Sequence, residues 1–194
     1  MRNLRQRLED ALAKSGDASS DFDLNADVKI PDAKLTPAAV LVGIRAETET
    51  VILTKRSARL KHHPGQIAFP GGKQDPTDLT LTEAALREAN EEIGLPYGVV
   101  DVVGTLPSHQ TVTGYLVTPI VGLITADFEA VAEAGEVSEV FEVPLAHLMN
   151  PAMYLIEGRR WRGTKRYYYT VPYGPYYIWG ATARMLRAFA DRMA

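Results

Sequence analysis

The chain of 194 residues contains no cysteine. This absence excludes disulfide bonds, thiolate nucleophiles and cysteine-ligated zinc or iron–sulfur sites. It agrees with a cytoplasmic protein, because disulfides persist mainly in oxidising compartments. Long hydrophobic runs are also missing, and an apolar stretch such as residues 38–44 is far too short to cross a bilayer. We therefore expect no membrane association.

Basic residues are fewer than acidic ones, with 21 Lys and Arg against 24 Asp and Glu. The formal net charge is −3, which argues against a general nucleic-acid-binding surface. An anionic ligand would need a local basic patch, and the stretch KRSARLKHH at residues 55–63 provides one. The 46% hydrophobic content is ordinary for a globular protein and sufficient for a hydrophobic core.

The hydrophobic pattern predicts an α+β protein, because strands and helices mix without a regular alternation. We expect an N-terminal helix and extended leader over residues 1–36 and a main domain over residues 37–194. Helices are predicted at 2–14, 80–93, 144–150 and 178–193. Strands are predicted at 38–46, 50–56, 66–69, 98–106, 115–124, 136–145, 152–158 and 165–172, the first and last pairs forming hairpins.

Three glutamates crowd the end of the predicted helix 80–93. At about 100° per residue, Glu88, Glu91 and Glu92 project from one face of that helix. One interpretation is a solvated face on which Arg87 pairs with Glu91. The other is a magnesium site, since Mg²⁺ prefers hard oxygen ligands and offsets the repulsion among carboxylates. The opposite, buried stripe is predicted to contain Leu86, Ala89 and Ile93.

A glycine pair lies just upstream of this helix, in the stretch FPGG. Gly71 and Gly72 permit a close backbone approach that side chains would block. A backbone carbonyl there can reach the same ion as the glutamates. A plain turn is the alternative, because two adjacent glycines are weak evidence alone.

Taken together, these residues resemble a known family. Gly72, Arg87, the three glutamates and Gly94 are similar to the Nudix box. Residues 52–72, ILTKRSARLKHHPGQIAFPGG, resemble the additional signature of the coenzyme A pyrophosphatase branch, as does YYIWGATARML at residues 176–186. The resemblance covers much of residues 38–190.

The chain departs from the family pattern at several positions. The stretch from Gly72 to Arg87 is one residue longer than in the general box, and Asp78 stands where the box has its first glutamate. No departure removes a metal ligand that the resemblance implies. The remaining differences are Ala89 for a bulky aliphatic residue, Ile52 for leucine and Lys61 for arginine.

The resemblance implies a Nudix-type α/β/α sandwich with a mixed β-sheet and hydrolysis that depends on Mg²⁺, for which Mn²⁺ can substitute. Glu88 and Glu92 would be the main metal ligands. Glu91 would be a further ligand or would act through water, and the carbonyl of Gly71 would be the backbone ligand. Arg87 would orient the glutamates.

The general base is less closely defined, because its position varies within the family. The candidates are Glu91 on the helix, or Glu136 or Glu139 in the stretch AEAGEVSEV. Ordinary surface charge is the alternative for the last two.

The basic stretch supplies candidates for substrate binding. Arg56, Arg59 and Lys61 can meet a diphosphate or the 3′-phosphate of coenzyme A. A solvated hairpin end is the alternative, and lysine at position 61 lacks the bidentate fork of arginine. Gln66 either contacts the substrate or packs the loop.

The leading hypothesis is a coenzyme A diphosphatase that releases 3′,5′-ADP and 4′-phosphopantetheine, and that also accepts acyl or oxidised forms. Alternative substrates are NADH, ADP-ribose or a damaged nucleotide. A catalytically silent nucleotide-binding domain is a hypothesis of another class. The partner is expected to be a small molecule, and monomer and homodimer both remain open.

Overall fold

The structure is a computed structural model that describes residues 3–25, 28, 34–161 and 163–194. Part of the predicted leader therefore lies outside the described residues. The α-helices are α1 (Leu4–Ala13), α2 (Leu81–Ile93), α3 (Leu145–Leu148) and α4 (Gly180–Met193). The strands are β1 (Ser19–Ser20), β2 (Thr36–Arg45), β3 (Thr50–Arg56), β4 (Ile67–Ala68), β5 (Gly71–Lys73), β6 (Val100–Thr105), β7 (His109–Gln110), β8 (Tyr115–Ile124), β9 (Val137–Pro144), β10 (Leu155–Trp161) and β11 (Thr164–Thr170).

The centre of the fold is a parallel pair of long strands. β2 and β8 pair in register along their whole length, from Thr36 opposite Tyr115 to Arg45 opposite Ile124. Most other strands of this nine-stranded sheet pair antiparallel, so the sheet is mixed, as predicted. Both central strands are apolar because both faces of the sheet are covered.

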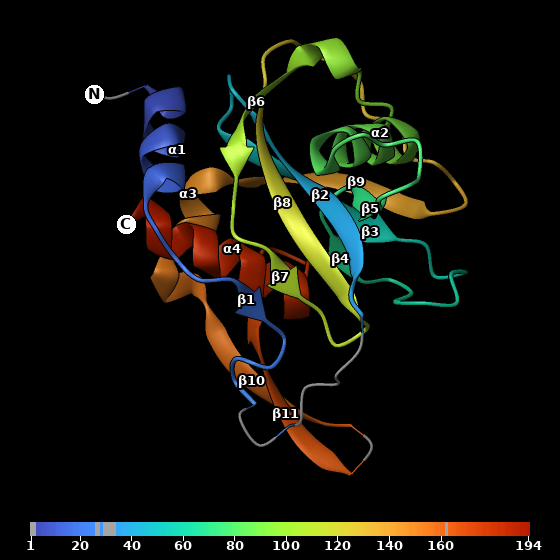
Figure 1. Ribbon diagram of the computed structural model, residues 1–194, viewed down its shortest axis with the longest axis vertical. Coiled ribbons are helices and arrows are strands. Elements are labelled where there is room, and N and C mark those ends of the chain that lie inside the picture. Colours follow the sequence, from blue (N-terminus) through green and yellow to red (C-terminus); the bar gives the residue numbers. More distant parts are fainter. Residues whose placement is uncertain (1–2, 26–27, 29–33, 162) are drawn as a thin grey trace.

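Helices cover the sheet on two sides, which confirms the α/β/α sandwich (Figure 1). On one face, α2 packs through Ala85 and Ala89 against Leu41 and Ile120. The other face carries the larger core, in which α1 and α4 meet side chains such as Val121. Within the described residues, no helix is both long and apolar enough to cross a membrane.

The first predicted hairpin exists only at its closed end. β2 and β3 pair at Ile44–Val51 and at Arg45–Thr50 and then separate. Beyond that point β5 pairs with β2 and β4 pairs with β3, while β9 pairs with the other edge of β3 along its length. The separation brings the glycine strand β5 into the sheet directly beneath α2.

Local signals fix the limits of α2. The Thr80 hydroxyl accepts a hydrogen bond from the backbone N–H of Glu83, which caps the first turn. Gly94 ends the helix in the left-handed conformation, with φ of 69°. The helix between these two caps carries the three glutamates on its last two turns.

The N-terminal segment joins the main core through buried contacts. Leu8 of α1 is fully buried among residues of α4. The buried His109 ring bonds to the Ser19 hydroxyl at 2.9 Å and to Asp21 at 3.1 Å. The short strands β1 and β7, which pair here, were missed from the sequence because two residues carry no periodicity. The division at residue 36 stays a prediction.

Gly71 allows the backbone of β5 to lie close to the backbone of β2. Its φ is 153°, and a Cβ atom added there would lie 2.4 Å from the backbone oxygen of Ala39. No side chain fits at this distance without a shift of backbone. Glycine at this position is therefore a requirement of strand pairing.

We expect Gly71→Ala to lower the free energy of unfolding by about 2 kcal/mol or more, because alanine adds both the overlap and an unfavourable φ. Gly98→Ala is the matched control, since a Cβ at Gly98 meets no atom within 4 Å. Urea unfolding of both variants measures the difference. An equal loss of unfolding free energy in both variants would contradict the requirement for glycine at position 71.

Candidate functional site

Arg87 links three acidic side chains at the exposed side of α2. Its Nε and Nη2 donate to the carboxylate of Asp78 at 3.0 and 2.9 Å. Its Nη1 donates to Glu88 at 3.0 Å and to Glu91 at 2.9 Å. The hydrogen bond from Arg87 is also the main reason why the pKa of Asp78 is lowered. These contacts agree with the predicted orienting role of Arg87, which stays a prediction.

Glu92 is buried, with 4% of its surface exposed, so of the two interpretations of the glutamates the solvated face does not hold at this position. Glu92 comes seven positions after Ala85, nearly two full helical turns, and so lies over a residue of the core face. Burial raises the pKa of Glu92 to about 8, although the backbone N–H of Gly71, which donates to its Oε2 at 3.3 Å, acts in the opposite direction.

Glu88 lies between Arg87 and the backbone of Gly72. A Cβ added to Gly72 would be 2.5 Å from Oε1 of Glu88, so the bare glycine makes room for the carboxylate. Burial is the main cause that raises the pKa of Glu88, while Arg87 lowers it. The two glycines of FPGG therefore contact two different glutamates through their backbone.

The donor set fits a hard divalent cation. Glu88 and Glu92 present carboxylate oxygens beside the backbone of β5, and Mg²⁺ favours such oxygen ligands. In the described part of the chain, however, no three His, Asp or Glu side chains are grouped closely enough to hold a metal ion on their own. The Glu91 side chain is 58% exposed and bound to Arg87. The assignment of Glu88, Glu91, Glu92 and Gly71 as ligands stays a prediction.

The other two candidates for the general base have different surroundings, since Glu136 directly precedes β9 and Glu139 lies within this strand. The charge of Glu136 makes a small contribution that raises the pKa of both Glu88 and Glu92, so it lies within electrostatic range of these carboxylates. Glu136 is exposed. Glu139 instead accepts a hydrogen bond from the Tyr176 hydroxyl. The structure therefore brings Glu136, and not Glu139, towards the glutamates of α2.

Among the basic candidates, Arg56 lies nearest the glutamates. Its positive charge lowers the pKa of Glu92, and its Nε is buried without a hydrogen-bond partner among the described residues. Arg59 and Lys61 are exposed on the loop that follows β3. Gln66 closes this loop, since its carbonyl accepts from the backbone N–H of Arg56 at 2.9 Å.

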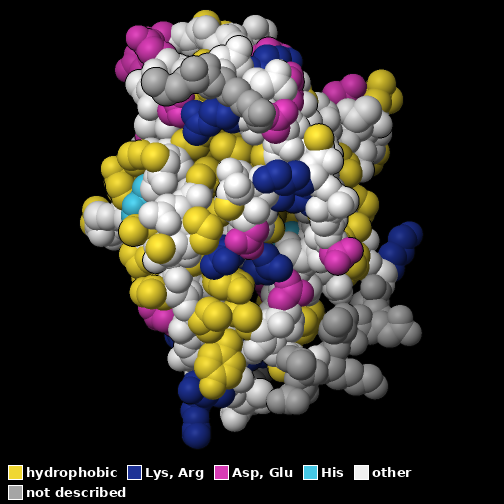
Figure 2. All heavy atoms as spheres, turned by 90° about the vertical axis from the view of Figure 1, so that its left-hand side faces the viewer, with side chains coloured by type: hydrophobic (Ala, Val, Ile, Leu, Met, Phe, Trp, Pro, Cys, Tyr) yellow, Lys and Arg dark blue, Asp and Glu magenta, His cyan; other side chains and the backbone are white. Residues whose placement is uncertain are grey.

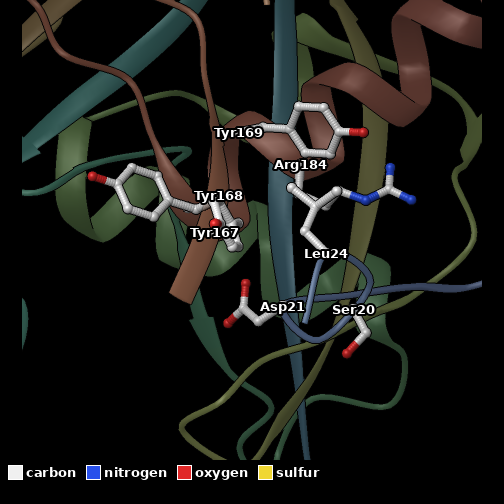
Figure 3. A pocket seen from close by; sticks show the side chains of 8 residues that line it. Ser20, Asp21, Leu24, Tyr167, Tyr168, Tyr169 and Arg184 are labelled. Carbon is white, nitrogen blue, oxygen red and sulfur yellow. The ribbon is translucent and has the colours of Figure 1, made fainter. Parts of the chain in front are cut away.

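Two hollows lie elsewhere on the molecule, and none of the described α2 glutamates lines either of them. The first, shown in Figure 3, lies where the N-terminal segment meets β11 and α4; its interior of about 20 Å³ suits a water-sized group and not a nucleotide. Tyr168 and Tyr169 point to opposite sides of β11 there. The second hollow has a volume of about 610 Å³ and lies where β2 and β8 end. Its lining includes Glu47, Asp127 and Glu142. An acidic lining disfavours anions.

Comparison with known proteins identifies the same family as the motif. A family model of the NUDIX domain matches residues 34–162. Proteins named "Uncharacterized Nudix hydrolase NudL" are 43% identical in Enterobacter sp. (strain 638) and 46% identical in Klebsiella pneumoniae subsp. pneumoniae, over 79% of this chain and 80% of each relative. The crystal structure of a MutT protein from Methanosarcina mazei Go1 matches with a TM-score of 0.50 at 23% identity, covering 62% of this chain and 84% of that chain. That structure supports the fold alone.

Burial of Glu92 predicts a pH-dependent stability of the metal-free protein. The pKa of Glu92 rises from 4.5 to about 8 on folding, so its protonation stabilises the fold below pH 4.5, and this contribution is lost as the pH rises through 8. We expect the free energy of unfolding in EDTA to fall by at most about 1.4 kcal/mol per pH unit in this window, relative to Glu92→Gln. Chemical unfolding of both proteins from pH 5 to 9 measures this, and parallel pH profiles would contradict it.

Proposed function

Because the chain belongs to the NUDIX family, we propose that it hydrolyses the diphosphate linkage of coenzyme A and its acyl or oxidised forms. The products are 3′,5′-ADP and 4′-phosphopantetheine. The cofactor is Mg²⁺, with Mn²⁺ as a substitute. Support for the substrate comes from the stretch of residues 52–72, which forms β3, the basic loop, β4 and the start of β5.

The observation that carries this proposal is the position of Arg56. Its buried Nε has no partner among the residues described, while its charge acts on Glu92 across the site. A buried guanidinium nitrogen without a partner is costly, and a phosphate oxygen is a suitable acceptor for it. Arg56 thus binds one phosphate of the diphosphate, and the exposed Arg59 and Lys61 meet the 3′-phosphate.

The acidic residues of α2 hold the cation that offsets the charge of the diphosphate. Glu88 and Glu92 supply carboxylate oxygens, and the backbone of Gly71 lies against Glu92. Arg87 keeps Glu88 and Glu91 in place through its fork to Asp78. When bound, Mg²⁺ neutralises phosphate charge and lowers the pKa of the attacking water.

Glu136 serves as the general base in this proposal. It is exposed to water and close enough to Glu88 and Glu92 to raise their pKa values. The carboxylate accepts a proton from water as the water oxygen forms a bond to phosphorus. The bridging P–O bond then breaks, and the departing phosphate keeps the electron pair.

A substrate panel tests the function. The purified protein is incubated with Mg²⁺ and, separately, coenzyme A, NADH, ADP-ribose and a nucleoside triphosphate, and products are identified by mass spectrometry. We expect coenzyme A to be cleaved fastest. Glu92→Gln should lower that turnover about a hundredfold or more, because a metal ligand is lost. Glu83→Gln is the control, because Glu83 lies in the first turn of the same helix and its carboxylate accepts a hydrogen bond from the backbone N–H of Leu79.

Other outcomes of the panel separate the alternatives. Faster cleavage of another member would keep the hydrolase and reject coenzyme A as the substrate. No cleavage of any member with Mg²⁺ or Mn²⁺ would contradict the enzymatic function and favour a silent nucleotide-binding domain. Normal turnover by Glu92→Gln would contradict the metal site.

The assignment of the base has its own test. We expect Glu136→Gln to lower kcat by about 10²- to 10⁴-fold, the range for loss of a positioned base. Glu139→Gln is the matched variant on the same strand region, and its kcat should change by no more than a few-fold, because its carboxylate is bound by Tyr176. Steady-state kinetics at saturating Mg²⁺ distinguish them. An equal loss in both variants would argue against Glu136 as the base.

A further inference from the structure

The hairpin of β10 and β11 forms a separate two-stranded sheet that extends away from the main sheet (Figure 1). Its exposed side chains include Leu155 at 54% and Ile156 at 56%. Successive residues of a strand point to opposite faces, so the hairpin is uncovered on both faces at this point. Figure 2 shows hydrophobic side chains over this lower part of the molecule, with Lys or Arg at the lower end. An isolated hairpin of this kind is only marginally stable in water.

The two edges of this small sheet differ. The edge of β11 is capped, because the Asn25 amide bonds to both the backbone N–H and the carbonyl of Tyr167, at 2.8 and 2.9 Å. The backbone of Thr170 also bridges to Trp179. Along β10, by contrast, no described strand other than β11 pairs with the chain. An open edge presents unpaired backbone groups to any matching strand.

The contacts of Tyr167 show which backbone groups of β10 face that edge. Tyr167 directs its N–H and C=O away from β10, and it lies directly opposite Gly158. In an antiparallel ladder this makes the two residues a non-hydrogen-bonded pair, so Gly158 directs its own N–H and C=O to the open side. Ile156 and Arg160, two positions away on either side, do the same.

We propose that β10 pairs antiparallel with β10 of a second copy of this chain, about a two-fold axis at Gly158, so that two hairpins form one four-stranded sheet. The two copies of Gly158 then exchange both backbone hydrogen bonds. Glu157 of each chain lies opposite Arg159 of its partner in a non-hydrogen-bonded pair, where opposing side chains are closest. Oε2 of Glu157 also accepts a hydrogen bond from the Tyr177 hydroxyl of its own chain at 2.7 Å, which leaves Oε1 for the arginine. The sequence of β10 is thus complementary to itself in this register.

Local charge, and not net charge, favours a second copy as the partner. Residues 155–170 contain five Lys or Arg and one Glu, a net charge of +4, so two hairpins side by side repel one another overall. The attraction in this register comes from the two pairs of Glu157 with Arg159 and from the backbone ladder. The exposed Arg159 and Arg160 also discourage pairing with unrelated strands.

A charge swap tests the register. Sedimentation of the full chain should give a particle of twice 21.3 kDa. Glu157→Arg alone and Arg159→Glu alone each place like charges opposite one another twice, and each should raise the dimer dissociation constant on the order of tenfold or more. The double variant E157R/R159E restores opposite charges and should return it to within about threefold of the original. Lys55→Glu makes the same charge change as Arg159→Glu at an exposed position of β3, outside the hairpin, and should have no more than about a threefold effect.

A cysteine cross-link tests the symmetry axis independently. The chain has no cysteine, so Gly158→Cys introduces a single thiol, whose partner in a second copy would lie at a Cα separation of about 5.5 Å, within disulfide range. A Cβ there meets Cε of the flexible Lys165 side chain at 2.8 Å and the edge of the Tyr167 ring at 3.1 Å, so both exposed side chains must shift slightly. Mild oxidation should give a covalent dimer with Gly158→Cys and little with Lys165→Cys.

Three results would overturn the proposal. One is a wild-type chain that stays monomeric at all concentrations, including one that binds phosphatidylserine vesicles as a monomer. Another is a dimer that both single charge variants leave intact, which would assign the interface to another surface. The third is equal cross-linking from positions 158 and 165. Circular dichroism of every variant checks that it is folded before association is measured.

Discussion

The acidic face of α2 depends on the hydrogen bonds and ion pairs that the guanidinium group of Arg87 makes. Three carboxylates close together on one helix repel one another. Arg87 bonds to Glu88 and Glu91 on that helix and to Asp78 on the loop before it. One half-buried cation therefore offsets the repulsion and fixes the loop to the helix. The side chains of Glu88 and Glu91 are held at the end of α2 that lies over β5.

Glycine completes this arrangement from the side of the sheet. Gly71 pairs closely with β2, and Gly72 leaves space for the carboxylate of Glu88. The parallel ladder of β2 and β8 provides the rigid platform on which β5 lies. Burial of Glu92 follows from the same packing, and its raised pKa is the electrostatic consequence. The close approach of β5 to β2 therefore accounts both for the burial of Glu92 and for its raised pKa.

Side-chain hydrogen bonds, more than long strands, connect the N-terminal segment to the central sheet and to the hairpin of β10 and β11. His109 holds the N-terminal segment through hydrogen bonds to Ser19 and Asp21. The Asn25 amide bonds to the backbone of β11 at the edge where a neighbouring strand would otherwise pair. Such contacts join distant parts of the chain without any hydrophobic periodicity. They leave one edge of the hairpin capped and the other open, which is the basis of the proposed association.

The sequence determined what depends on neighbouring residues. The helix α2, the long strands β8 and β9 and the spacing of the three glutamates follow from local patterns, and these three elements were predicted close to their observed limits. Only the tertiary structure decided that Glu92 is buried, that β2 and β3 separate to admit β5, and that Glu136 approaches the glutamates while Glu139 bonds to Tyr176. The physical reason is that burial and electrostatic proximity depend on segments remote in the chain, whose approach no helical or strand period encodes.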